Sequence, residues 1–433
     1  MKDVLVSDHI ANKLVSFGVT HVFGIIGSAN SYIFDSIYRH EKLELICLHH
    51  EQACVMAAHG YYRQSGKMAV VLVTAGAGIT NALTGVMGAW ADSVPILIIS
   101  GQESTQQFKN KNICRMIGIQ GVFTESIYSS CTKKVVTCMS GAQAINELNI
   151  CLNLATTPRL GPCIVDMPID IQAEKINNVN LIKTQKTTAD NNEFNLNNIN
   201  SLLFDNLIKK IHSSRRPLLW LGNGLRTSDR SELEIILKDL SIPYLTSWTA
   251  NDIVKPIEKL YAGHAGTYGS RAGNIILQSC DLLITLGTRL AVPQIGYRHD
   301  EIAREADIYV VDIDSIELKK LGSRFKKIKA DAFLVLKELH KSISPNYVSQ
   351  SEWMKHIKEV KKLLPKLESI HKTNNNKHVN SYQFISELGS KARKNTTFVT
   401  DMGTALISGF QMLNMKDDQK LFTSQGLGEM GYG

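Results

Sequence analysis

The sequence predicts an α/β protein made of successive doubly wound parallel-sheet domains. Strand-like and helix-like stretches alternate along the chain, and several strands are apolar over their whole length, as in Met68–Thr74. A strand of this kind is covered on both faces of its sheet. Such alternation indicates a parallel sheet with helices on both sides. The 433 residues are enough for two or three domains of this class.

The first domain is predicted at residues 1–172. Its helices are expected from Ser7 or Asp8 to Phe17, over 32–38, from Glu51 onward, and up to Trp90; its strands are expected at 21–25, 43–48, 68–74, 95–101 and 163–167.

Two polar stretches divide the rest of the chain. Residues 173–200 and 342–380 lack apolar periodicity over most of their length, which is typical of surface connections. The central domain is therefore expected at 201–341, and a third, incomplete domain at 381–433. Further expected elements are strands near 218–222, 281–287, 307–314 and 396–400, a helix at 353–364 inside the second linker, and a helix from Ser381.

Composition indicates an ordinary soluble protein, with 44% hydrophobic and 20% charged residues. The net charge of +8 comes partly from basic clusters such as 319–329 and favours anionic small molecules. The basic residues are not interleaved with aromatic residues in the kind of stripe that is typical of a nucleic-acid-binding surface. None of the 8 cysteines forms a C-x-x-C pair, which suits free thiols in a reducing cytoplasm. With no signal peptide and no membrane-length apolar run, we expect a cytoplasmic protein.

Glu51 occupies a strand-to-helix junction, where open α/β sheets place their ligands. The carboxylate could be a buried acid/base group. It could equally make an ordinary capping or dipole interaction at the first turn of the helix. The neighbouring His49 and His50 suggest a metal, but no second cluster with ligand spacing accompanies them, so we predict no metal ligands in this chain.

Two glycine-rich turns follow apolar strands. Gly76-Ala77-Gly78 has Asn81, and Gly222-Asn223-Gly224 has Thr227, where a dinucleotide fingerprint needs its third glycine. The hypothesis of a nicotinamide- or flavin-binding oxidoreductase depends only on these two incomplete matches. The first turn either lets a helix pack close to a strand or brings backbone amides to a ligand.

Taken together, the motifs resemble the thiamine-diphosphate enzymes of the acetolactate synthase type. The resemblance covers nearly the whole chain and is strongest in residues 1–172, which it identifies as the family's pyrimidine-binding domain. It implies that residues 201–341 form the central domain and that residues 381–433 are the start of the diphosphate-binding domain. The matching segments are Val22-Phe23-Gly24 with Gly27, His50-Glu51-Gln52-Ala53, Gly60-Tyr61, Thr74 to Asn81, Asp92-Ser93-Val94-Pro95, Gly101-Gln102, Gly161-Pro162, Val165 to Pro168, Gly266-Thr267, Asp281-Leu282-Leu283, Gly287-Thr288-Arg289 and Gly426 to Gly431.

The resemblance implies a role for individual residues. Glu51 corresponds to the glutamate that hydrogen-bonds the cofactor's aminopyrimidine and so activates the cofactor, a task that requires a carboxyl group withdrawn from water. Gln120 aligns with a glutamine near the substrate, although a surface glutamine is the alternative. Gly428 corresponds to a residue whose backbone carbonyl accepts a hydrogen bond from the 4′-amino group, and Met430 to an apolar wedge, with a core methionine as the alternative. The further residues expected to line the cofactor are Gly27, Thr74, Gly76, Gly78 and Asn81.

The implied activity is that of a lyase or carboligase acting on a 2-keto acid by decarboxylation, with thiamine diphosphate and Mg²⁺ as cofactors. In this family the site is shared between subunits, so that Glu51 would face Met430 of another copy. A homodimer or a homotetramer is therefore expected, and no nucleic-acid or membrane partner.

Two departures limit the resemblance. The family's Gly-Asp-Gly motif and downstream Asn, which hold diphosphate and Mg²⁺, would lie beyond Gly433, so the chain as written is expected to bind the cofactor poorly. A catalytically inactive truncated paralogue or a fragment is thus the alternative to an active enzyme. In the central domain, Leu290 to Gln294 replace an acidic, Arg-bearing segment, which makes FAD doubtful.

Overall fold

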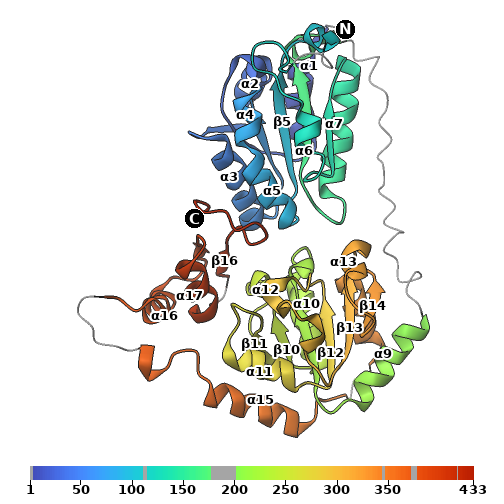
Figure 1. Ribbon diagram of the computed structural model, residues 1–433, viewed down its shortest axis with the longest axis vertical. Coiled ribbons are helices and arrows are strands. Elements are labelled where there is room, and N and C mark those ends of the chain that lie inside the picture. The colour runs from blue at the N-terminus through green and yellow to red at the C-terminus, as the bar shows by residue number, and fades with distance from the viewer. Residues whose placement is uncertain (1–2, 111–114, 177–200, 344–346, 372–377, 417) are drawn as a thin grey trace. The chain divides into compact units, whose positions relative to one another are not determined.

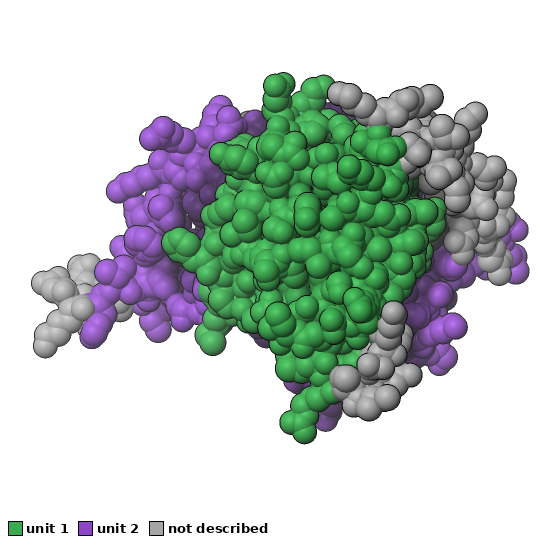
Figure 2. All heavy atoms as spheres, turned by 90° about the horizontal axis from the view of Figure 1, so that it is seen from above, with its two compact units in different colours: residues 1–190, 423–433 green, residues 191–422 purple. Residues whose placement is uncertain are grey.

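A computed structural model describes residues 3–110, 115–176, 201–343, 347–371, 378–416 and 418–433 (Figure 1). The chain forms two compact units, coloured separately in Figure 2. The N-terminal unit contains residues 1–190 and 423–433, and the central unit contains residues 191–422. Most of the first predicted linker (177–200) and residues 344–346 and 372–377 of the second lie outside the described residues.

The N-terminal unit is built on a six-stranded sheet with the order β3-β2-β4-β5-β7-β6, and every neighbouring pair is parallel. Its strands are β2 (His21–Gly24), β3 (Glu44–Cys47), β4 (Ala69–Val73), β5 (Ile96–Gln102), β6 (Lys134–Thr137) and β7 (Cys163–Pro168). The predicted fold class is confirmed.

Helices cover both faces of this sheet. On one side pack α1 (Val6–Ser16), α2 (Ser31–Tyr38), α7 (Gly141–Thr156) and α8 (Ile169–Gln172). On the other side pack α3 (Glu51–Ser65), α4 (Ala77–Asn81), α5 (Leu83–Ala91) and α6 (Thr124–Tyr128). The positions of its side chains explain why β4 is apolar throughout. Val70 and Leu72 pack in the core on the first side of the sheet, whereas Val71 and Val73 pack in the core on the other side.

The start of the first helix differs from the prediction. Helix α1 begins at Val6, directly after the short strand β1 (Val4–Leu5), which pairs antiparallel with β8 (Lys175–Ile176). Ser7 and Asp8 therefore lie inside the first turn and do not cap the helix. The Asp8 carboxylate accepts hydrogen bonds from the Ser36 hydroxyl and the Arg39 guanidinium.

The central unit contains a second six-stranded parallel sheet, with the order β11-β10-β9-β12-β13-β14. Its strands are β9 (Pro217–Leu221), β10 (Tyr244–Thr246), β11 (Tyr261–His264), β12 (Leu282–Leu286), β13 (Asp307–Asp312) and β14 (Phe325–Lys329). The strand order reverses between β9 and β12. In doubly wound sheets, ligands bind at such a switch point, outside the carboxyl ends of the strands.

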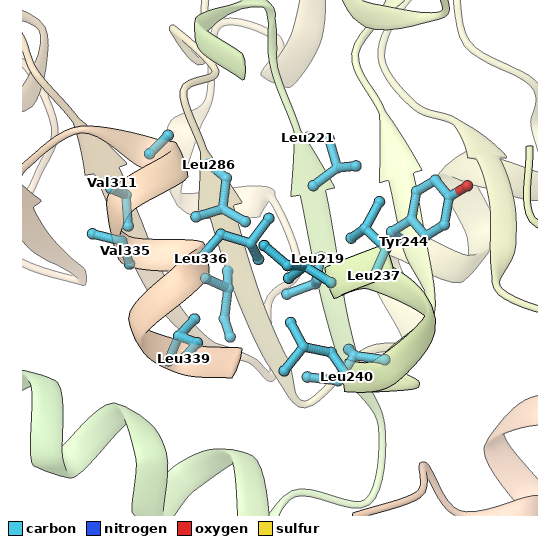
Figure 3. Packing of buried hydrophobic residues seen from close by; sticks show 14 of the residues in the cluster. Leu219, Leu221, Leu237, Leu240, Tyr244, Leu286, Val311, Val335, Leu336 and Leu339 are labelled. Atoms are coloured by element: carbon cyan, nitrogen blue, oxygen red, sulfur yellow. The ribbon is translucent and has the colours of Figure 1, made fainter. Parts of the chain in front are cut away.

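Two apolar layers enclose this sheet. Figure 3 shows the layer beneath α10 (Arg230–Leu240) and α14 (Ala332–Ser342), where Leu219, Leu237 and Leu336 pack together without exposure to solvent. Helix α9 (Ser201–Ser213) completes this layer. The opposite layer is formed with α11 (Arg271–Ser279) and α15 (Ser351–Leu363), and α12 (Val292–Ile295) and α13 (Ser315–Lys319) are shorter helices of the same unit.

The first part of the predicted third domain packs within the central unit. It contains α16 (Ser381–Lys391), α17 (Thr404–Met412) and a parallel pair of strands, β15 (Thr397–Val399) and β16 (Lys420–Phe422). Phe410 of α17 meets the ring of Trp248, with 5.8 Å between ring centroids. Residues 423–433 then join the N-terminal unit.

Candidate active site

Glu51 is the first residue of α3 and lies just beyond the carboxyl end of β3. The residue that caps this helix is His50 and not Glu51. Nδ1 of His50 accepts a hydrogen bond from the backbone N–H of Gln52 at 3.2 Å. The Glu51 side chain is instead buried inside the unit, with the residue 9% exposed. Its Oε2 accepts a hydrogen bond of 3.0 Å from Nδ2 of Asn81. The structure therefore brings these two predicted site residues together.

The Gly76–Gly78 turn lies directly in front of this carboxylate. Gly76 has a φ of 63°, which favours glycine, and a Cβ added there would come within 2.3 Å of the Gln120 carbonyl oxygen. A Cβ added to Gly78 would lie 2.8 Å from Cγ2 of Thr74 and 3.5 Å from Oε1 of Glu51. The glycines thus allow the turn to approach Thr74, Gln120 and Glu51 closely, and they leave open the space beside Oε1.

Thr74, at the end of β4, adds a hydroxyl group to the same place. Its Oγ1 is buried and has no hydrogen-bond partner among the described residues. A Cβ added to Gly27 would come within 2.4 Å of that oxygen. Glycine at position 27 therefore keeps space next to a buried hydroxyl that is still able to bind a polar group.

Gln120 is held beside the turn by a carboxylate that the sequence analysis did not single out. The backbone N–H of Gln120 donates to Oε1 of Glu103 at 3.0 Å. Added Cβ atoms at Gly118 and Gly121 would come within 2.6 and 2.8 Å of Glu103 side-chain atoms, so this side chain lies against the loop. The position of Glu103, directly after the Gly101-Gln102 motif, is the sequence signal that could have identified it.

Two buried polar side chains at the end of the sheet, Gln102 and Asp166, hold the same loop in place. Nε2 of Gln102 donates to the Val122 carbonyl and to Oδ2 of Asp166, each at 3.0 Å. Burial raises the pKa of Asp166 to about 6, and the hydrogen bonds from Gln102, Ser100, Thr124 and Thr137 oppose this shift. Asp166 was predicted only as part of a family motif, and its position shows that it supports the loop that carries Gln120.

The segment that carries Gly428 and Met430 packs elsewhere on the N-terminal unit. The backbone N–H groups of Gln425 and Gly426 donate to the two carboxylate oxygens of Asp92, at 2.9 and 2.7 Å. The Tyr432 ring packs edge-on against His59, in the middle of α3, whereas Glu51 lies at the N-terminus of that helix. Met430 is 82% exposed and does not belong to the core. Gly428 has a φ of 78° in the same loop.

Buried titratable groups surround this attachment point. Burial raises the pKa of Asp92 to about 6, and burial followed by the charge of Arg63 lowers the pKa of His59 to about 3. His59 Nε2 lies 3.6 Å from Oδ2 of Asp92. Because His59 is neutral at pH 7, this contact is not an ion pair.

Comparison with known proteins identifies the group to which this site belongs. Residues 5–127 match the family "Thiamine pyrophosphate enzyme, N-terminal TPP binding domain", and residues 204–339 match "Thiamine pyrophosphate enzyme, central domain". The acetolactate synthase large subunit of Porphyra purpurea is 31% identical over 432 residues, which cover 98% of this chain and 71% of that protein. The chain belongs to the thiamine pyrophosphate enzymes of the acetolactate synthase type.

Other members of the family show a similar extent of likeness. The acetolactate synthase large subunit of Lactococcus lactis subsp. lactis is 26% identical, with 99% of this chain and 72% of that protein covered. The isozyme 2 large subunit of Escherichia coli K12 is 26% identical, with 98% and 73% covered. The predicted resemblance is thus confirmed at the level of the family and of a thiamine-diphosphate-dependent enzyme.

The chemistry of the Glu51 site fits the cofactor of this family. It combines a buried carboxylate, an amide that holds one carboxylate oxygen, an unpartnered hydroxyl at Thr74 and a glycine turn with little steric bulk. In the part of the chain that the structure describes, no three His, Cys, Asp or Glu side chains gather as a metal-binding group. None of the helices described there is both long and apolar enough to cross a bilayer.

Proposed function

We propose that the protein is a lyase or carboligase that cleaves or joins carbon–carbon bonds beside the carbonyl group of a 2-keto acid. When bound, thiamine diphosphate supplies the electron sink for such a reaction. The relatives are named acetolactate synthases, which supports this substrate class. The observation that carries the proposal is the buried Glu51 carboxylate, held at Oε2 by Asn81 and open at Oε1 toward the Gly78 turn.

In this proposal the two oxygens of Glu51 have different tasks. Asn81 holds Oε2 and so orients the carboxyl group, because an amide N–H donates along a defined direction. Oε1 holds or releases the proton that is exchanged with the aminopyrimidine. The position of Oε1 beside the open Gly78 turn supports this role, because a general acid or base must lie within hydrogen-bond reach of the proton that it transfers.

Further residues around Glu51 complete the proposed site. We assign Thr74, Gly27, Gly76 and Gly78 to the surface that contacts the cofactor, and Gln120 to the substrate side of the loop held by Glu103. Gly428 and Met430 are proposed to reach the Glu51 of a second copy in a homodimer or homotetramer. The exposure of Met430 supports this assignment, because an apolar side chain that functions at another subunit must be free at the surface of its own.

Two cofactor questions belong to the same proposal. Mg²⁺ with the diphosphate is expected from the family, and its ligands are proposed to come from outside the residues described. The segment after β12 has few side chains available to bind FAD. Leu290 is buried in the core, Gln294 hydrogen-bonds to Thr288, and Arg289 pairs with Glu317. We therefore propose that the central domain holds no flavin, which the absorbance of the purified protein near 450 nm would test.

The test uses the full-length protein with thiamine diphosphate, Mg²⁺ and pyruvate or 2-oxobutanoate, and measures CO₂ release. Glu51→Gln should lower the rate by about 10²–10⁴-fold, the usual contribution of a positioned acid–base group. Glu44→Gln is the matched control, because Glu44 is exposed on β3, and it should leave the rate unchanged. Unimpaired turnover in Glu51→Gln would refute the assignment. An inactive wild-type protein that still binds the cofactor would favour the non-catalytic paralogue.

A further inference from the structure

The central unit contains a cavity that the proposed reaction does not use. It has a volume of about 340 Å³ and lies against strand β11, between the end of α15 and the end of α17. Volumes of this size accommodate small-molecule ligands. Strand β11 is the edge of the sheet, so the cavity is two strands away from the switch point between β9 and β12.

Two lysines give this cavity a positive charge. Nζ of Lys361 donates to the Tyr261 carbonyl at 2.8 Å, and Nζ of Lys366 donates to Oδ1 of Asn414 at 3.2 Å. An ammonium group has three donors, so each lysine can donate further bonds. Among the described residues that line the cavity, none is Asp or Glu. Two cations without a lining carboxylate form an environment that favours an anion.

A buried histidine supplies a third polar group. His264 ends β11, lines the cavity and is only 1% exposed, and neither of its ring nitrogens has a hydrogen-bond partner in the described part of the chain. Burial and the charge of Lys366 lower the pKa of His264 to about 3, so the ring is neutral at pH 7 and offers one N–H donor. An unsatisfied buried polar group is unfavourable, and a ligand with an acceptor atom would relieve this cost.

The remaining walls are largely apolar. Phe410 and Leu413 of the α17 region and Leu364 after α15 line the same cavity. A bare inorganic ion would leave these side chains without contact, whereas a short aliphatic body would cover them. Lysine acts as a flexible point charge and not as a planar fork, so it binds the head group of either a carboxylate or a phosphate ester.

We propose that this cavity is a binding site for a small organic anion. The head group is held by Lys361, Lys366 and His264, and an aliphatic body packs against Phe410 and Leu413. Residues of β11 and of the α17 region line the cavity together, so that occupancy stabilises the packing of α17 on the central sheet. The inference is independent of the chemistry assigned to Glu51, because none of these residues belongs to the N-terminal unit.

Isothermal titration of the whole protein at pH 7 with isovalerate and with isobutyl phosphate tests this site. The two probes share one aliphatic body and differ in the head group, and neither has a keto group. We expect saturable binding of at least one probe, and the preferred head group identifies the ligand as a carboxylate or a phosphate ester. Lys366→Met should weaken binding by about tenfold or more, because a charge-assisted hydrogen bond is lost.

The matched control is Lys362→Met, which removes an exposed lysine of α15 that does not line the cavity, and binding should be unchanged in it. Glu51→Gln should likewise bind the probe as the wild type does. If circular dichroism shows that Lys366→Met is misfolded, Lys361→Met provides the same test. Absence of saturable binding for both probes, or equal affinity in a folded lysine-cavity variant and the wild type, would overturn the proposal.

Discussion

Asn81 Nδ2 donates a hydrogen bond of 3.0 Å to Glu51 Oε2, and this bond joins the end of α4 to the beginning of α3. The contact links two residues thirty positions apart in the chain. Only one oxygen of the carboxylate is engaged by this amide. The other lies next to the turn at Gly78, where the absence of a side chain leaves room for a ligand.

Replacing Asn81 by Ala tests whether this bond orients the carboxylate. A hydrogen bond to a charged group contributes about 1.5–3 kcal/mol, so we expect kcat to fall by about 10- to 100-fold. The measurement is the steady-state rate of CO₂ release, with circular dichroism to confirm the fold. Asn12→Ala is a suitable control, because its side chain donates to the Asp8 carbonyl on an exposed helix of the same unit. A rate equal to that of the wild type in Asn81→Ala would show that Glu51 is positioned without it.

The glycine turn gives a prediction in which backbone conformation and steric contact act together. Gly66 and Gly76 both have a positive φ, of 73° and 63°, but ψ is 1° at Gly66, in the left-handed helical region, and −116° at Gly76. Of the two, Gly76 is the position where an added Cβ would meet another atom, the Gln120 carbonyl oxygen at 2.3 Å. Gly66→Ala should therefore cost about 1 kcal/mol in the free energy of unfolding, from backbone conformation alone. Gly76→Ala should cost about 1–3 kcal/mol more, because its backbone lies outside the left-handed helical region and because the loop that carries Gln120 must move.

Urea unfolding curves of the two glycine variants provide the comparison. The activity of Gly76→Ala should also fall, whereas Gly66→Ala should keep the wild-type rate. Equal destabilisation by both substitutions would mean that the loop yields without cost and that the close approach at Gly76 is unimportant.

The residues around Glu51 could be predicted because they lie in short motifs directly after strands. The parallel sheet then places the carboxyl ends of β2, β3 and β4 at one edge, so Gly27, Glu51 and Thr74 converge. Glu103 was missed although it directly follows the Gly101-Gln102 motif, because its contact with the backbone of Gln120 forms only in the folded loop. The exact location of Met430 and Gly428 on the unit also follows from tertiary contacts, chiefly those of Asp92.

Several strands escaped prediction for a different reason. The strands β6, β10 and β11 contain 4, 3 and 4 residues, too few for a clear apolar run. Strand β14 reads Phe-Lys-Lys-Ile-Lys and was taken as part of a basic surface cluster. It is an edge strand in which Lys326 pairs with Asp307, and lysines are common on such edges.

The stability of the contact between residues 423–433 and the rest of the N-terminal unit should depend on pH through two groups, whose effects on stability are opposite in sign. The pKa of His59 is lowered to about 3, so as the pH falls below 6.5 the unfolded chain takes up a proton before the folded one, and stability is lost. The pKa of Asp92 is raised to about 6, so between pH 6 and 3.8 the folded chain takes up the proton first, and stability is gained as the pH falls. Arg63, Glu429 and Tyr432 are the other titratable groups at this position.

Single substitutions separate the two contributions. Between pH 7 and pH 4.5, the urea midpoint of His59→Leu should fall less steeply than that of the wild type, and that of Asp92→Asn more steeply. Parallel pH profiles for all three proteins would show that neither group titrates differently in the folded and unfolded states.

The cavity lined by Lys361 and Lys366 predicts that a substitution which weakens ligand binding makes the unliganded protein more stable. Burial, and then the charge of Lys361, lowers the pKa of Lys366 from 10.5 to about 8. Keeping this half-buried ammonium charged is therefore unfavourable below pH 8. As the pH rises from 8 to 10.5 the folded protein loses the proton first, and the unfavourable contribution is relieved. The titratable groups that face it are Lys361 and the neutral His264, with Glu258 acting on Lys361.

Without ligand at pH 7, Lys366→Met should raise the free energy of unfolding by roughly 1–3 kcal/mol, since one pKa unit corresponds to about 1.4 kcal/mol and the side chain is half-buried. This advantage should shrink at pH 10, where the wild-type lysine is neutral in the folded state. Thermal unfolding at both pH values measures the effect, and Lys362→Met should match the wild type throughout. A Lys366→Met protein that is less stable at pH 7, or equally favoured at both pH values, would show that the ammonium is well accommodated without an anion.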